Sequence, residues 1–110
     1  MSGTPLPRDP NSYGVQIVAP SFAGGVESAF TGTAARLTLA DGRVAFQFTA
    51  RGGDCRILFG DSTVTAVDDA TSVVFLAGSA ILAKPKGATH VSVIGLGADT
   101  GLFQAWPVDL

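Results

Sequence analysis

Apolar residues recur at every second position through much of the chain, and this period of two is the feature that most constrains its fold. In the run RVAFQFT, residues 43–49, Val44, Phe46 and Phe48 fall on one face and Gln47 falls on the other. Successive side chains of a β-strand point to opposite faces, so this spacing buries one side of a strand and leaves the other in water. No comparable stretch repeats at the spacing of a capped α-helix. We therefore expect strands throughout the chain.

Further alternating or apolar runs predict a series of short strands. The expected strands cover residues 14–19, 35–39, 43–49, 55–59, 63–67, 73–77, 80–84, 89–94 and 102–106. Short strands separated by turn residues are typical of sandwiches and barrels. We therefore predict an all-β fold, a small antiparallel β-sandwich or jelly-roll-like barrel of about eight strands, over residues 14–110. For residues 20–33 the sequence allows two predictions, a long connection between sheets or a single helical turn around Glu27.

Asp41 and Gly42 lie between two of these runs, and Asp-Gly in that position is a strong signal for a tight turn. We therefore expect residues 35–39 and 43–49 to pair as a β-hairpin. The inward faces of the strands define the predicted core, in which Cys55 is a small buried residue. Its other members are Leu37, Leu39, Phe46, Phe48, Ile57, Phe59, Val91 and Val93.

Charged residues make up 15% of the chain and the net charge is −2, with no run of basic residues. Nucleic-acid binding needs basic residues that neutralise phosphates, so no nucleic-acid partner is expected. No apolar run approaches the ~20 residues of a membrane-spanning helix, and the first residues lack the pattern of a signal peptide, so no membrane partner is expected. Cys55 is the one cysteine, which excludes an intramolecular disulfide. A reducing compartment fits this usage, although a secreted protein without disulfides has the same composition.

The stretch RILFGDST, residues 56–63, resembles the motif of GDSL-type esterases, in which a buried strand ends in Gly-Asp-Ser and the serine is the nucleophile. A serine nucleophile needs a base within hydrogen-bond reach, which that family supplies from a late Asp-x-x-His motif. Here the one histidine is His90, and Gly87 stands where the aspartate would be. We therefore predict that residues 60–62 turn the chain between two strands, with Asp and Ser bonded to nearby backbone amides, and that the chain has no catalytic residue.

A glycine-rich stretch, VSVIGLG at residues 91–97, resembles the start of a dinucleotide-binding fold. That motif needs a helix and a second strand after it, and only nine residues follow Gly101. We expect a bend and a hairpin turn there instead. Asp68 and Asp69 are interpreted as a turn facing water and His90 as an exposed or rim imidazole, because a metal site needs several convergent ligands. No cofactor or metal is predicted.

Residues 1–13, MSGTPLPRDPNSY, form an arm of prolines and small polar residues that has little to bury. Proline favours extended backbone, so the arm is either a frayed terminus or a strap that orders on a partner protein. We assign partner contacts to five residues of the arm and to the single tryptophan, which is either a core cap or an interface anchor. These candidate residues are Pro5, Pro7, Arg8, Pro10, Tyr13 and Trp106.

Three segments carry a further resemblance: DCRILFG at 54–60, VVFLAG at 73–78 and KPKGATHVSVI at 84–94. Together they resemble a type of small β-rich protein found among the structural genes of tailed phages and prophages. The resemblance implies a non-enzymatic virion component, foremost a head decoration (cement) protein that oligomerises and stabilises the capsid exterior. It implies assembly in the host cytoplasm and location in the virion, with the major capsid protein or another virion protein as partner. It also implies a homo-oligomer, with a trimer favoured, and supplies no active site.

Composition favours the same class, because a small domain with few charges has apolar surface to bury against other subunits. A glycine-rich monomer with an ordinary surface is the alternative. The alternative function is a neck, tail or fibre accessory component that acts as a small carbohydrate- or receptor-binding module. The few aromatic residues and dispersed acids of the chain offer little of what such a module normally uses.

Overall fold

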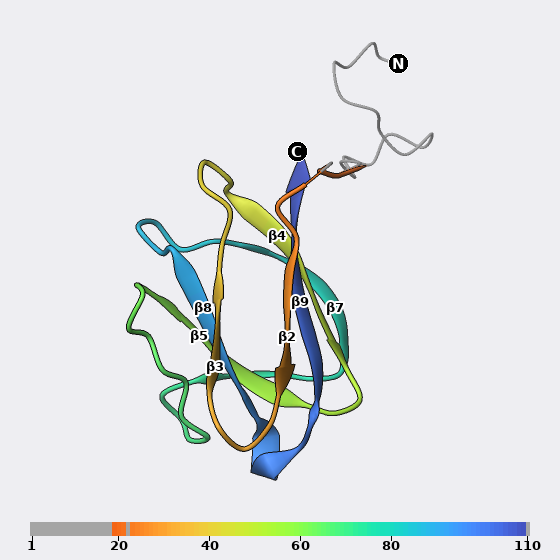
Figure 1. The fold of residues 1–110 in the computed structure, drawn as a ribbon, viewed down its shortest axis with the longest axis vertical. Coiled ribbons are helices and arrows are strands. Elements are labelled where there is room, and N and C mark those ends of the chain that lie inside the picture. The colour runs from red at the N-terminus through yellow and green to blue at the C-terminus, as the bar shows by residue number, and fades with distance from the viewer. Residues whose placement is uncertain (1–18, 22, 110) are drawn as a thin grey trace, which may run out of the picture.

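The computed structural model describes residues 19–21 and 23–109, which form two antiparallel β-sheets packed face to face (Figure 1). The first sheet contains β1 (Ala19–Pro20), β2 (Val26–Phe30), β4 (Ala45–Arg51), β7 (Gly78–Ala83) and β9 (Gly101–Asp109). The second sheet contains β3 (Ala35–Thr38), β5 (Cys55–Gly60), β6 (Val73–Phe75) and β8 (His90–Gly95). A short 3₁₀ turn, η1 (Leu96–Ala98), precedes β9. The predicted all-β sandwich is confirmed, and the arm predicted over residues 1–13 lies outside the described residues.

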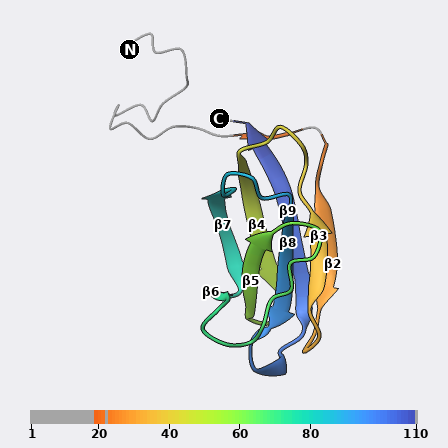
Figure 2. The ribbon, with the colours of Figure 1, turned by 90° about the vertical axis from the view of Figure 1, so that its left-hand side faces the viewer.

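Strand β9 runs through the first sheet with β4 on one side and both β1 and β2 on the other. β7 pairs with the far side of β4 and is therefore an outer strand. In the second sheet the order is β3, β8, β5, β6, so β6 is also an outer strand. Only residues 76 and 77 connect β6 to β7, and the two strands lie at the same edge of the sandwich (Figure 2).

The hairpin predicted around Asp41 and Gly42 is wrong. β3 pairs with β8 in the second sheet, whereas β4 pairs with β7 and β9 in the first. The Asp41-Gly42 turn therefore carries the chain from one sheet to the other, and every connection except β1–β2 and β5–β6 makes a similar crossing. A hairpin and a crossing both direct alternate apolar residues into one core, so the local pattern does not distinguish them.

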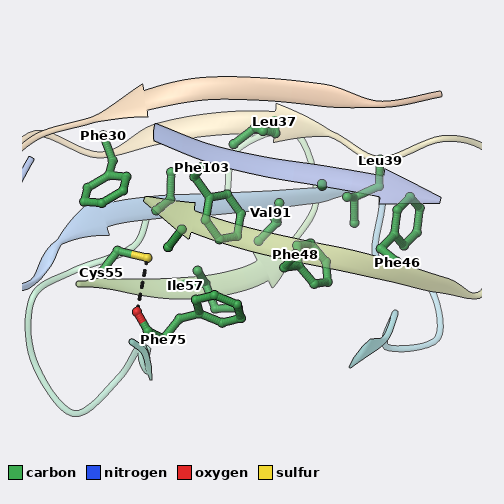
Figure 3. Packing of buried hydrophobic residues seen from close by; sticks show 13 residues of the cluster. Phe30, Leu37, Leu39, Phe46, Phe48, Cys55, Ile57, Phe75, Val91 and Phe103 are labelled. Carbon is green, nitrogen blue, oxygen red and sulfur yellow. Dashed lines mark hydrogen bonds between the residues drawn. The ribbon is translucent and has the colours of Figure 1, made fainter. Parts of the chain in front are cut away.

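The core is a layer of aromatic and aliphatic side chains between the two sheets (Figure 3). Phe48 contacts both sheets, because its ring stacks on Phe103 of β9 and meets Phe59 of β5 edge-on, each at a centroid distance of 5.7 Å. Cys55 is buried as predicted, and its Sγ lies 3.5 Å from the Phe75 carbonyl oxygen. Burial raises the pKa of this thiol to about 12. The other predicted core residues are confirmed, with Phe59 only partly buried: Leu37, Leu39, Phe46, Ile57, Val91 and Val93.

Several predicted strand limits differ from the structure. Val44 was expected to share the buried face of Phe46. However, β4 begins at the next residue, Ala45, and the Val44 side chain just before it is 64% exposed. The strand predicted over residues 102–106 continues to Asp109. Residues 20–33, for which a connection or a helical turn was expected, contain β2 instead. Of the strand predicted over residues 14–19, only Ala19 is described.

The strand predicted over residues 63–67 is also wrong, because residues 61–72 form an irregular segment against the outer face of the second sheet. Side chains of the underlying strands hold its backbone. The hydrogen bonds are Ala66 N–H to Ser92 Oγ (2.9 Å), Arg36 Nε to the Val64 carbonyl (2.7 Å) and Arg56 Nη1 to the Ser72 carbonyl (3.0 Å). The segment thus bonds part of its backbone to side chains of the strands below without joining a sheet, and its alternation reflects residues that pack onto those strands.

Asp68 links this segment to two other parts of the fold. Its carboxylate accepts hydrogen bonds from the Gly97 N–H and from Arg56 Nε, each at 2.8 Å, and these bonds, led by that of Gly97, lower the pKa of Asp68. A carboxylate with a lower pKa in the folded than in the unfolded state adds stability above its unfolded pKa. That stability is lost as the pH falls through the folded pKa. We expect Asp68→Asn to melt at a lower temperature than the wild type at pH 7, with the difference closing below about pH 4.

Thermal melts followed by circular dichroism between pH 7 and pH 2 measure this difference. Asp41→Asn is the matched control, because the Asp41 side chain forms no hydrogen bond to another described residue. A gap between Asp68→Asn and the wild type that stays constant down to pH 2 would contradict the assignment.

Candidate functional site

The outer faces of the two sheets carry different surfaces. Residues 61–72 cover much of the second sheet, whereas the middle of the first sheet presents polar and aromatic side chains that are at least partly exposed. On neighbouring strands β4 and β9, Gln47 lies opposite Trp106 and Thr49 lies opposite Gln104. This face, together with the edge strand β7 beside it, is the candidate functional site.

The position of Trp106 follows from an interruption in the first sheet. β1 and β2 pair with the same side of β9, but residues 21–25 between them lie opposite only Trp106 and Pro107. The longer stretch must therefore bulge out of the ladder. Pro107 has no N–H to donate, and proline is tolerated inside a sheet at such a bulge. Its carbonyl still accepts a hydrogen bond from the Ser21 N–H at 2.9 Å.

The indole of Trp106 replaces the missing ladder bond. Its Nε1–H donates to the Ser21 carbonyl oxygen at 2.9 Å. In a continuous antiparallel ladder this oxygen would accept a hydrogen bond from the backbone N–H of residue 107, which proline lacks. Gly25 lies directly against the ring, because a Cβ at that position would come within 1.9 Å of the indole carbon Cε3. The absence of a side chain at Gly25 thus allows the bulge to close over one part of the indole.

A groove of about 280 Å³ opens beside Trp106. Its lining contains an indole, two primary amides and a threonine hydroxyl, and none of its residues is charged. The lining residues are Pro20, Ser21, Gln47, Thr49, Gln104 and Trp106. An aromatic ring beside amides that can both donate and accept hydrogen bonds suits a small neutral ligand with several hydroxyl groups.

The outer side of β7 has no strand partner among the described residues. The Lys84 N–H donates to the Val44 carbonyl at 2.8 Å, which sets the alternation of the β4–β7 ladder. Residues 78, 80 and 82 therefore bond to β4, whereas Ser79, Ile81 and Ala83 direct their N–H and C=O groups away from it. The strand sequence GSAILA contains neither a charge nor a proline, the usual features that prevent an edge from pairing.

Exposed apolar side chains lie around this edge, and we refer to them as the apolar rim. They belong to β7, to β6 and to the connection between them. Their exposed fractions are 48% for Ile81, 66% for Val73, 44% for Val74 and 63% for Leu76. Ile81 lies on the outer face of the first sheet and Val74 on the outer face of the second, so these side chains flank the edge and do not form a single patch.

The turn predicted at residues 60–62 is confirmed through Asp61. Its carboxylate accepts hydrogen bonds from the Thr63 N–H at 2.8 Å and from the Thr63 hydroxyl at 2.6 Å. These bonds, led by that of the hydroxyl, lower the pKa of Asp61. The predicted backbone bond of Ser62 is not present among the described residues, and Ser62 is exposed.

The structure places His90 opposite Gly60 on neighbouring strands, a proximity to the Gly-Asp-Ser turn that sequence reasoning missed. His90 Nδ1 lies 2.7 Å from the Thr89 hydroxyl. Within the described part of the chain, Ser62 Oγ forms no hydrogen bond to His90, although a serine nucleophile needs such a base.

The glycine-rich stretch 91–97 forms part of β8 and η1, after which β9 enters the other sheet. The predicted bend is confirmed there, but the hairpin turn is wrong because the two strands do not pair. Asp68, predicted to face water, is ion-paired with Arg56. Asp69 accepts a hydrogen bond from the Thr71 N–H at 2.8 Å, as in the predicted turn. No group of three potential metal ligands converges within residues 19–21 and 23–109.

Of the six residues assigned to partner contacts, only Trp106 is described. Its Nε1 bond and its contact with Gly25 are structural, and its remaining surface lines the groove. The other five lie outside the described residues: Pro5, Pro7, Arg8, Pro10 and Tyr13. Sequence reasoning missed the free edge of β7. The uncharged run GSAILA indicates such an edge only when the strand is known to lie at the edge of the sheet.

No protein-family model, curated protein or solved structure matches the chain. The described residues contain no helix that is long and apolar enough to cross a membrane.

Proposed function

We propose that the chain is a non-enzymatic structural protein of a phage virion, a head decoration (cement) protein that binds the capsid exterior and oligomerises. The observation that carries this proposal is the uncharged edge of β7, which has no strand partner among the described residues and lies beside the apolar rim. A free edge of this kind templates pairing with another chain, and stable proteins normally block it with charge, proline or cover. An edge left open in this way fits a protein that functions in an assembly.

The charge distribution supports a protein partner. The rim and the β7 strand contain no ionisable side chain, and the whole chain has a net charge of −2 without a basic run. Contacts with another protein bury such a surface, whereas contacts with nucleic acid depend on basic residues. The resemblance of residues 54–60, 73–78 and 84–94 to small virion proteins favours the capsid as that partner.

The proposal is tested by adding the purified protein to capsids assembled without it. We expect saturable binding to the heads and an increase in the temperature at which the capsids break open. Ser62→Ala is the matched variant, because Ser62 is exposed and its hydroxyl forms no hydrogen bond within the described residues, so this variant should bind as the wild type does. Hydrolytic activity that is lost in Ser62→Ala, or a failure to bind any part of the particle, would overturn the proposal.

The groove beside Trp106 favours a second candidate, a carbohydrate-binding module on a neck, tail or fibre. Its uncharged lining of indole and amides suits a neutral saccharide. Trp106 is the one tryptophan, so its fluorescence reports directly on this groove. A change in emission on titration with neutral oligosaccharides, weakened in Gln47→Ala, would favour this candidate over capsid decoration.

A further inference from the structure

The free edge of β7 is complementary to itself. It directs N–H and C=O groups outwards at alternate residues, Ser79, Ile81 and Ala83, and these three are centred on Ile81. An antiparallel copy of the same strand presents the same groups in reverse order. We infer that two copies of the chain pair through β7 about a twofold axis at Ile81, which joins their first sheets into one continuous sheet.

The register of this pairing follows from the positions of the free groups. With the axis at Ile81, each Ile81 lies opposite the other, and Ser79 of either copy lies opposite Ala83 of its partner. Each of these three pairs exchanges two hydrogen bonds, so all the free groups of both strands are used. If one copy moves along by two residues, one of the three pairs falls beyond the end of the strand. Its partner residue is then either Pro85 or Ala77 of the β6–β7 connection, and the hydrogen bonds of that pair are lost. A shift by one residue opposes groups that already bond to β4.

Side chains favour the same register. The two Ile81 side chains, each 48% exposed, contact one another on the outer face of the joined sheet. On the inner face Ala80 lies opposite the partner's Leu82, and both are apolar. Lys84, the first charge after the strand, lies opposite Gly78 and so meets no like charge.

The second sheets add to the contact. β6 lies at the same edge of the sandwich as β7 (Figure 2), so the twofold axis brings the rim residues of both copies towards each other. Val73 and Leu76, which are exposed beside β7 in the single chain, then face the partner's edge and add apolar contact to the hydrogen-bonded strands. The pairing therefore accounts for both unusual features of this edge, its free backbone and its apolar rim. Pairing about a twofold axis gives a dimer, whereas the resemblance favours a trimer.

This inference deepens the proposed assembly role and rests on it for its biological setting, but its test uses the free protein and not the capsid. Ile81→Cys places two thiols opposite each other across the axis, within the span of a disulfide. Ser79→Cys is the matched control, because each new thiol then lies opposite Ala83 and far from its equivalent. Cys55 is buried in both variants and does not take part.

Under mild oxidation we expect a covalent dimer as the main product of Ile81→Cys and none from Ser79→Cys. The double variant Ser79→Cys/Ala83→Cys should again form a dimer. Sedimentation should give a dimer for the wild type and a monomer for Ile81→Lys, whose two ammonium groups would face each other. A wild-type monomer at the concentration of the oxidation, or equal cross-linking of the two single variants, would overturn the inference. Failure of pairing with intact capsid binding would leave the proposed function in place.

Discussion

Phe48→Ala is expected to lower the free energy of unfolding by about 3–5 kcal/mol. The ring is fully buried and lies between Phe103 of its own sheet and Phe59 of the other, so its removal leaves a cavity that neither sheet can close alone. Two aromatic contacts are lost together with the burial. A loss of this size is a large share of the stability of a small domain, about 5–15 kcal/mol.

Urea unfolding followed by tryptophan fluorescence measures this loss for Phe48→Ala. Val44→Ala is the matched control, because Val44 shares the alternation of Phe48 but is 64% exposed, and its replacement should change stability by less than about 0.5 kcal/mol. Equal stability of the two variants would show that the register assigned to β4 is wrong, since a one-residue slip exchanges the two faces of a strand.

Gly101→Ala should have a comparably large effect, for a different reason. A Cβ at Gly101 would lie 2.1 Å from the Arg51 carbonyl oxygen and 2.7 Å from the Phe30 ring. The first of these atoms belongs to the backbone of β4, so relief requires that β4 and β9 separate at the end of the first sheet. Overpacking of a tight core contact costs about 1–3 kcal/mol, and a clash with backbone belongs at or above the upper end of that range.

Gly32→Ala is the control for Gly101→Ala, because a Cβ at Gly32 meets its nearest neighbour, the Ala98 Cβ, at an ordinary 3.4 Å. Thermal melts of both variants should show a clear loss for Gly101→Ala and little change for Gly32→Ala. If Gly101→Ala melts with the wild type, the close approach of β4, β9 and β2 at this point is wrong.

The fold class was predictable because the alternation of apolar residues reports the local conformation and the buried face at once. Phe46, Phe48, Val91 and Val93 all lie where that alternation places them. The pairing of strands was not predictable, because a crossing between sheets and a hairpin use the same turn residues. The Asp41-Gly42 turn shows this, since it joins two strands that never pair.

Two further differences have physical causes in single residues. β2 was missed because Ser28 occupies the middle of its inward face and hides the alternation of Val26 and Phe30. Residues 63–67 alternate like a strand, but their backbone is held by side chains such as Ser92 and Arg36. Neither interaction is visible without the arrangement of the sheet beneath.

The candidate site was predictable only at Trp106. Its aromatic ring and its neighbour Pro107 are apparent in the sequence, but the bulge that holds the ring depends on the register of β9 against two separate strands. The free edge of β7 depends on strand order, which follows from long-range pairing. A run such as GSAILA has the same composition in the centre of a sheet, where it would have no free groups.

The claim that the chain functions in a virion is tested most directly by its copy number in purified phage particles. Quantitative mass spectrometry of gradient-purified virions should find it in a constant ratio to the major capsid protein, in fractions of heads as well as whole particles. Absence of the chain from the particles, with all of it recovered in the soluble fraction of the infected host, would contradict the account.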